Sequence, residues 1–153
     1  MKSYNMALVK FMEKKARWLE EELSIPGTWY FSEGDRDDIM QWDGAEAEKI
    51  WKKIRDAILR HNCSGLRYEF CPFCHKYEYQ HIECSKVVHN PSCLLCSYGK
   101  NHGICTDPTE GVSDYRNILK AFEDDRIDIH RFFSNSYYRE LIAELENLVE
   151  RNY

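Results

Sequence analysis

The sequence lacks a long hydrophobic run. Among its 153 residues, no stretch approaches the roughly 18 consecutive apolar residues of a membrane-spanning helix. The first 25 residues also lack a secretory core, because charged residues such as Lys10, Glu13 and Arg17 interrupt every apolar run. We therefore expect a cytoplasmic protein without a membrane partner.

An excess of basic charge is also lacking. The chain has 21 Lys and Arg against 26 Asp and Glu, which gives a formal net charge of −5. Nucleic-acid-binding domains usually carry a basic face. The basic groups here alternate with acids on expected helices, which favours solvated, ion-paired surfaces over a nucleic-acid interface. These groups are Lys10, Lys14, Lys15 and Arg17, then Lys49, Lys52, Lys53 and Arg55.

Motifs for catalysis are scarce. The seven glycines form no phosphate-binding loop, and no nucleophile is paired with a base by a known motif. The acids Asp35, Asp37 and Asp38 could hold a divalent ion, but their segment lacks the glycine and the distal Glu of a calcium loop. A solvated loop is the simpler interpretation, and the sequence favours a non-catalytic protein.

Apolar residues recur at helical spacing in four segments, two on each side of a cysteine-rich middle. In the first segment, a stripe from Leu8 to Leu23 is followed by a Pro-Gly pair that ends the helix. In the second, a stripe from Ala47 to Ile58 follows Asp43, a residue suited to cap a helix N-terminus. The expected helices cover residues 4–23, 43–60, 113–122 and 136–149.

The segment between the first two helices is rich in aromatic and acidic residues, and we expect an irregular connection there. Aromatic side chains anchor many protein interfaces, because they bury a large area with little loss of rotamer freedom. This segment could therefore dock a protein partner, although its indoles could instead fold back onto the helical core. Its aromatic residues are Trp29, Tyr30, Phe31 and Trp42.

The chain has seven cysteines, an odd number, and no secretion signal, which favours metal binding over disulfides. Two Cys-x-x-Cys pairs, Cys71/Cys74 and Cys93/Cys96, are separated by 18 residues. Pairs separated by about 15–20 residues are typical of a four-thiolate zinc site. Four thiolates fill the tetrahedral shell of Zn²⁺, so we expect a structural ion with no open position for catalysis.

Other cysteines and histidines leave the ligand set open. Cys105 could replace a cysteine of the second pair, or form a second site with Cys84, His89 and His102. Cys63 is expected to be an ordinary buried thiol. His75 and His81 are expected to face solvent or to support the sulfurs through hydrogen bonds.

The segments "LRYEF" and "HKYEYQHI" flank Cys71-Pro72-Phe73-Cys74 and have strand composition, which predicts a β-hairpin around the two thiols. Thiol redox catalysis of the glutaredoxin type would need a helix after Cys71, and the alternation of Tyr77 and Tyr79 predicts a strand there instead. A zinc deaminase is disfavoured because only seven residues separate Glu83 from Pro91, too few for the intervening strand.

The cysteine pattern resembles that of small uncharacterised archaeal, bacterial and phage proteins. The matching residues are Cys-Pro-Phe-Cys-His-Lys-Tyr, then Cys-Leu-Leu-Cys, Gly103-Ile104-Cys105 and Tyr115, within residues 68–118. The sequence differs in having Ser97 where proline is usual and in a longer gap between the pairs. The resemblance implies a metal cluster with a fifth cysteine, Cys105, and no particular activity.

The sequence therefore predicts an α-dominated α+β fold, with helices flanking a small β-hairpin module of the zinc-ribbon type. We expect one domain over residues 1–153, with a helical part (1–62), a zinc-binding module (63–112) and C-terminal helices (113–153). The expected function is a non-catalytic, protein-binding or regulatory role with one Zn²⁺. The alternative is a nucleic-acid-associated accessory factor that uses the zinc hairpin.

Overall fold

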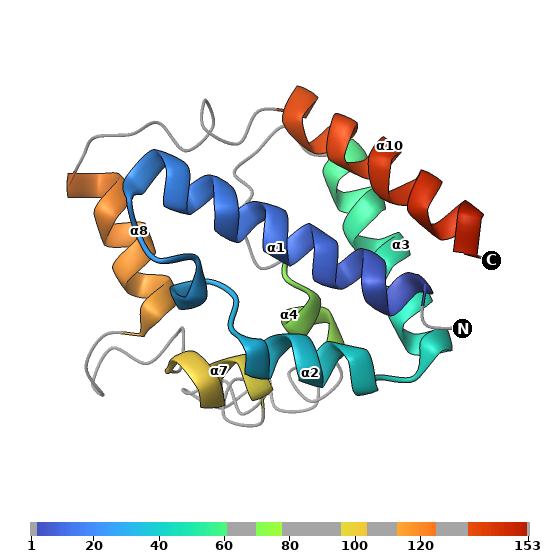
Figure 1. Ribbon diagram of the computed structural model, residues 1–153, viewed down its shortest axis with the longest axis horizontal. Coiled ribbons are helices and arrows are strands. Elements are labelled where there is room, and N and C mark those ends of the chain that lie inside the picture. Colours follow the sequence, from blue (N-terminus) through green and yellow to red (C-terminus); the bar gives the residue numbers. More distant parts are fainter. Residues whose placement is uncertain (1–2, 61–69, 78–95, 104–112, 125–134, 153) are drawn as a thin grey trace.

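The long N-terminal helix α1 (Ser3–Leu23) crosses the middle of the molecule, with α3 (Gly44–Arg60) and α10 (Asn135–Asn152) packed beside it (Figure 1). The computed structural model describes residues 3–60, 70–77, 96–103, 113–124 and 135–152, and every element in these ranges is helical. The other elements are η1 (Gly27–Trp29), α2 (Glu33–Gln41), α4 (Pro72–Lys76), α7 (Ser97–His102) and α8 (Asp114–Asp124).

The core forms where α1, α3 and α10 meet. Trp51 of α3 is fully buried, and its ring stands edge-on to that of Phe11 with centroids 6.3 Å apart. Its indole N–H donates to Glu146 of α10 at 3.1 Å, so burial leaves its polar atom satisfied. Phe11 also contacts Tyr138 of α10, with centroids 6.2 Å apart. Each such large side chain contributes roughly 1.5–3 kcal/mol when it is fully buried.

The four expected helices are confirmed as α1, α3, α8 and α10. All six residues of the α3 stripe are buried, as its periodicity predicted. Asp43 caps α3, because its Oδ2 accepts a hydrogen bond from the Glu46 amide at 3.4 Å. Ser113 caps α8 in the same way, accepting from the Arg116 amide at 3.2 Å. The buried α3 stripe is Ala47, Ile50, Trp51, Ile54, Ala57 and Ile58.

The expectation of an irregular connection between α1 and α3 is wrong, because this segment contains η1 and the nine-residue helix α2. Ser32 and Asp35 form a reciprocal capping box, in which each side chain accepts a hydrogen bond from the other residue's amide. The side chain of Asn5 closes the other end of α2 by donating to the carbonyls of Ile39 and Trp42 at 2.6 and 3.0 Å. The capping box and the contact from Asn5 of α1 therefore stabilise a helix in a segment whose polar composition had suggested an irregular loop.

The prediction of an α+β fold with a zinc-ribbon hairpin is also wrong for the residues that the structure describes. Residues Pro72–Lys76 form the short helix α4, and no strand occurs in the described ranges. Pro72 at the first position favours the helix, because its fixed φ suits the first turn and its missing N–H needs no partner there. The remainder of the expected strands, residues 66–69 and 78–82, lies outside the described ranges.

The cysteine-bearing helices pack on the helical part of the chain. Helix α4 contacts α3, and α7 contacts α2. None of the helices in the described ranges is long and apolar enough to cross a lipid bilayer. The division into parts at residues 62 and 112 stays a prediction, since both positions fall outside the described residues.

Candidate functional site

Helix α4 presents the first Cys-x-x-Cys pair at the molecular surface. Phe73, between the two cysteines, is fully buried and anchors the helix. Its ring meets Trp42 edge-on, with centroids 5.3 Å apart, and Tyr98 of α7 at 5.5 Å. With Phe73 inserted into the core, Cys71 is half-buried and Cys74 is exposed.

The sulfur of Cys71 is surrounded by hydrogen-bond donors. It accepts hydrogen bonds from the Cys74 side chain and from the backbone amides of Cys74 and Phe73, and the Lys15 ammonium attracts it. The Cys74 hydrogen bond has the largest effect, and together these contacts outweigh burial and lower the pKa of Cys71 to about 7. A thiolate at this position is suited either to metal binding or to nucleophilic attack.

Lys15 interacts electrostatically with both cysteines of this pair, and the expectation of a solvated side chain at this position is wrong. Only 1% of the residue is exposed. Its ammonium lies 4.9 Å from the ring centroid of Phe11 and 5.2 Å from that of Tyr30, and donates to the Phe70 carbonyl at 3.5 Å. Burial lowers the pKa of Lys15 to about 7, and the attraction of the two cysteines opposes part of that shift.

Of the second Cys-x-x-Cys pair, the structure describes Cys96. Cys96 is half-buried at the N-cap of α7, and the next residue, Ser97, accepts a hydrogen bond from the Tyr77 hydroxyl at 3.3 Å. This contact joins the end of α4 to the start of α7. Among the described residues, however, no group of three or more His, Cys, Asp or Glu side chains is arranged so that it could hold a metal ion. Cys93 lies outside those residues, so the four-cysteine prediction is not tested as a whole.

The other candidate ligands are only partly placed by the structure. Cys63, His81, Cys84, His89 and Cys105 lie outside the described ranges. His75 is half-buried on α4, where it lines a cavity facing α3. Both ring nitrogens of His102 are hydrogen bonded to carboxylates, those of Asp35 and Asp114.

His102 on α7 lies between two carboxylates, an arrangement that the sequence patterns did not indicate. Its Nε2 is 2.5 Å from Oδ2 of Asp35 on α2, and its Nδ1 is 2.8 Å from Oδ2 of Asp114 on α8. Tyr98 stacks on the imidazole with centroids 4.3 Å apart, and Asn101 donates to the other oxygen of Asp35 at 2.9 Å. The cluster therefore joins α2 to α7 and α8, and its contact between Asp35 and His102 spans 67 positions of sequence.

Glycine makes the approach of α8 possible. Gly103 ends α7 with φ at 88°, a conformation that side-chain-bearing residues rarely adopt. A Cβ at this position would lie 3.1 Å from the Cα of Ser113, the residue that precedes Asp114. The absence of a side chain at Gly103 thus allows Asp114 to reach His102.

The geometry of this cluster favours a doubly protonated imidazole. An ionised carboxylate can only accept hydrogen bonds, so both ring nitrogens of His102 must donate to satisfy Asp35 and Asp114. Burial disfavours the charge, but the hydrogen bonds and the attraction of the two carboxylates outweigh it and raise the pKa of His102. The signal available in the sequence was the Ser32–Asp35 capping box, which would have placed Asp35 at a helix start.

The cysteine pair could also support thiol redox chemistry, and the objection that no helix follows Cys71 is wrong, since α4 begins at Pro72. Thiol exchange requires an accessible attacking thiolate. Cys71, whose pKa is lowered, is the half-buried member of the pair, whereas Cys74 is the exposed one. This arrangement suits a thiolate that binds a metal ion better than one that attacks a substrate disulfide.

Comparison with family models, with curated proteins and with solved structures finds no match to this chain. The resemblance of its cysteine pattern to small microbial and phage proteins therefore stays a prediction.

Proposed function

We propose that the protein is a non-catalytic, cytoplasmic zinc-binding protein that acts as a protein-interaction or regulatory module. The expected ligands are Cys71, Cys74, Cys93 and Cys96, with Cys105 as the alternative to one of the second pair. The hydrogen bonds that the Cys71 sulfur accepts from the amides of Phe73 and Cys74 carry this proposal. Amides that face a sulfur in this way stabilise it as a thiolate, the form that binds metal.

The chemistry of the donors fits zinc. Thiolates are soft ligands, and Zn²⁺ accepts four of them without imposing a geometric preference. The contact between Tyr77 and Ser97 supports a shared ion, because it holds the turn after Cys74 next to the residue after Cys96. Metal binding and local folding are coupled in small thiolate sites, so we expect zinc to draw the two pairs together.

The exposed indole of Trp29 supports a protein partner. Trp29 in η1 is 41% exposed, whereas Tyr30 and Phe31 are buried and Trp42 is half-buried against Phe73. The carboxylate of Glu20 lies beside η1, 3.1 Å from where a Cβ on Gly27 would stand. A large apolar ring near an acidic side chain suits a partner segment that offers both apolar and basic side chains.

Elemental analysis of protein purified without added metal tests zinc binding. We expect close to one zinc per chain, with a reduced content after Cys71→Ser, Cys74→Ser or Cys96→Ser. Cys63→Ser is the matched control and should retain its zinc. A zinc content near zero, or iron in place of zinc, would contradict the proposal. Loss of metal in Cys105→Ser but not in Cys96→Ser would show that Cys105 is the ligand.

Co-purification from the native host tests the interaction role. A partner retained by the wild-type chain should be lost from Trp29→Ala and kept by Leu59→Ala. Leu59 is the matched control, since it is also a large exposed apolar residue but lies on α3, outside the proposed surface. Equal loss from both variants would indicate nonspecific apolar adsorption. A salt-dependent shift with labelled single-stranded oligonucleotides would instead favour the alternative, a nucleic-acid accessory factor.

A further inference from the structure

The two cysteines of α4 lie in one helical turn that is anchored to the core. The Cys71 carbonyl accepts a hydrogen bond from the His75 amide at 3.4 Å, and this turn encloses Cys74. Phe73, between the two cysteines, is fully buried and holds the turn through its aromatic contacts. The backbone of the pair is therefore positioned by the fold.

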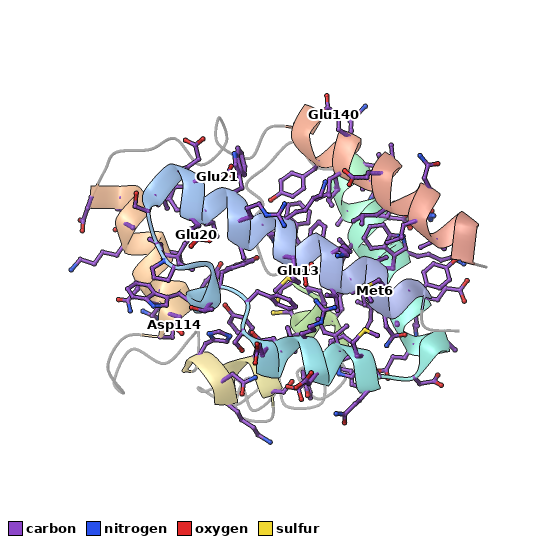
Figure 2. The ribbon with its side chains drawn as sticks, viewed as in Figure 1. Met6, Glu13, Glu20, Glu21, Asp114 and Glu140 are labelled. Carbon is purple, nitrogen blue, oxygen red and sulfur yellow. The ribbon has the colours of Figure 1, made fainter. Side chains whose placement is uncertain are left out.

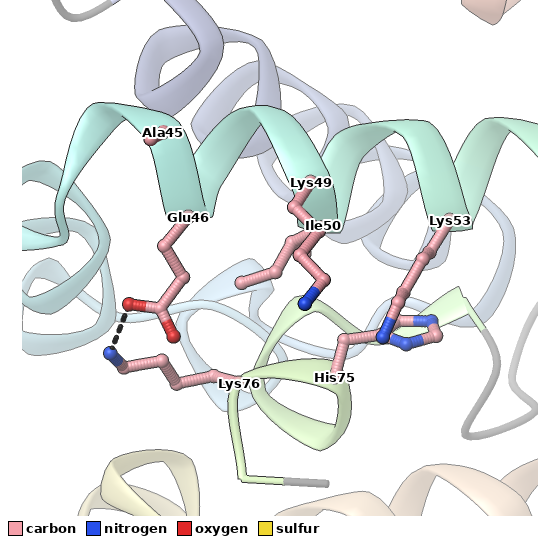
Figure 3. Close-up of a pocket in the computed structure, with 7 residues that line it drawn as sticks. All are labelled: Ala45, Glu46, Lys49, Ile50, Lys53, His75 and Lys76. Atoms are coloured by element: carbon pink, nitrogen blue, oxygen red, sulfur yellow. Dashed lines mark hydrogen bonds and ion pairs between the residues drawn. The ribbon is translucent and has the colours of Figure 1, made fainter.

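The other end of α4 is fixed as well. Lys76 forms an ion pair with Glu46 of α3 at 2.6 Å, which is drawn as a dashed line in Figure 3. The Lys76 ammonium also lies 5.7 Å from the ring centroid of Trp42. Since the core and α3 both hold this five-residue helix, packing with the rest of the chain sets the relative positions of its two cysteines.

The two sulfurs are in contact. The Cys74 side chain donates a hydrogen bond to the Cys71 sulfur, which also accepts from the backbone amides of Phe73 and Cys74. A disulfide joins sulfurs about 2 Å apart on Cβ atoms about 3.5–4.5 Å apart, so a pair that is already hydrogen bonded needs only small side-chain rotations to close. Cys-x-x-Cys pairs at a helix start form reversible disulfides in many redox proteins.

We propose that Cys71 and Cys74 form a reversible disulfide in response to hydrogen peroxide or another small peroxide. The Cys71 thiolate attacks one peroxide oxygen, the O–O bond breaks, and the departing hydroxide takes a proton to become water. The Cys74 sulfur then attacks the sulfenic acid on Cys71, so that an S–S bond forms and a second water leaves. One peroxide is reduced to two waters as two thiols are oxidised to one disulfide.

The exposure of the two sulfurs suits a small oxidant. Cys71 is half-buried, which hinders the approach of a protein disulfide but admits a molecule little larger than water. Cys74 is exposed at the surface, so its side chain can rotate toward the oxidised sulfur without displacing the core. The attacking and resolving roles therefore follow from the hydrogen bonds and the exposure of each cysteine.

Oxidation would also regulate the proposed zinc site, and this part of the proposal rests on the proposed function. A disulfide offers no thiolate to a metal ion, so closing it removes two of the four expected ligands and should release the zinc. Exchange with a reducing thiol would restore both ligands.

Peptide mass spectrometry of zinc-free protein treated with hydrogen peroxide tests the disulfide. We expect the tryptic peptide 68–76 to become lighter by two hydrogens and to resist alkylation until dithiothreitol is added. Cys74→Ser should instead accumulate a sulfenic acid on Cys71 that dimedone traps, and Cys71→Ser should lose the disulfide. Cys63→Ser is the matched control and should form the same disulfide as the wild type.

A chromogenic chelator measures zinc release from the metal-loaded wild type, where we expect peroxide to free the ion and dithiothreitol to allow it to rebind. A chain that forms the disulfide but is purified without zinc would contradict the proposed function and support the disulfide. Three results would overturn the disulfide: both thiols still reduced after peroxide, Cys71 joined to another cysteine, or Cys71 oxidised to a sulfinic acid while Cys74 stays reduced. Zinc retained after the disulfide has formed would overturn the regulation.

Discussion

The imidazole of His102 and the carboxylate of Asp35 form a buried ion pair across 67 positions of sequence. Asp35 is fully buried, and only 2% of the His102 side chain is exposed. The pair links α7 to α2, and the second carboxylate, Asp114, extends the link to α8. Asp114 is labelled in Figure 2, at the end of α8 that lies toward α7.

The first prediction concerns the pH dependence of stability. The pKa of His102 is raised in the folded state, so its contribution is fully present below the unfolded value of about 6.5 and is lost as pH rises through the folded value. Lys15 changes the stability in the opposite direction. Because burial lowers its pKa to about 7, the stability of the fold rises as the pH increases from about 7 to 10.5. The prediction is therefore made for the difference between wild type and His102→Gln.

Urea unfolding at a series of pH values measures this difference. The stability advantage of wild type over His102→Gln should be largest near pH 6 and should shrink as pH rises from about 6.5 through the folded pKa of His102. A constant difference across this range would mean that folding does not raise the pKa of His102, and would contradict the role given to its charge.

The second prediction concerns Asp35. Asp35→Ala should lower the free energy of unfolding by about 3–5 kcal/mol, because it removes the partner of a buried charge and breaks the capping box with Ser32. Asp37→Ala, on the exposed side of the same helix, should change it by less than about 0.5 kcal/mol. Chemical denaturation of the two variants makes the comparison, and similar values would contradict it.

The third prediction concerns Asn5, which closes α2 from α1. Asn5→Ala removes the side-chain donor to the Ile39 and Trp42 carbonyls, of which the Ile39 carbonyl keeps the Trp42 amide as a donor, and should cost about 1–3 kcal/mol of stability. Hydrogen exchange should show the loss as faster exchange in α2. Faster exchange spread evenly over the chain, with none concentrated in α2, would disagree with this local role.

The fourth prediction concerns the buried Lys15. Lys15→Met should leave stability unchanged or raise it, because it keeps the packing of the stem and removes the cost of burying an ammonium. The pKa of Cys71 should rise toward its ordinary value, since the attraction of Lys15 helps to lower it. In zinc-free protein, Cys71 should then react more slowly with iodoacetamide at pH 7.

Lys14→Met is the control for this experiment. Lys14 is half-buried and pairs with Glu144 of α10, away from the cysteine pair. An unchanged alkylation rate in Lys15→Met, or an equal slowing in Lys14→Met, would contradict the influence of Lys15 on Cys71.

The helical parts of the fold could be predicted because their apolar residues recur at a single period. The α3 stripe and the cap at Asp43 needed no information beyond neighbouring residues. Helix α4 could not be predicted in this way, because its five residues are too few to show a period and Phe73 is held by Trp42 and Tyr98 from distant segments. The strand composition of the flanking residues therefore led to the wrong prediction of a β-hairpin.

The same distinction applies to the candidate sites. The spacing of the cysteines was visible in sequence, whereas the burial of Lys15 depends on contacts with Tyr30 and Phe70 from other segments. His102 could be named as a candidate ligand, but its two carboxylate partners come from α2 and α8. No local pattern records such a meeting of three helices.

The position of α1 has a consequence for synthesis of the chain. Its apolar face is covered partly by α10, through contacts such as that of Phe11 with Tyr138. Ribosomes add roughly 5–20 residues per second, so α1 emerges on the order of ten seconds before the helix that covers it. During that interval α1 and α3 can pair, but one side of Phe11 stays open to water. Until α10 is released, this apolar surface is of the kind that chaperones bind.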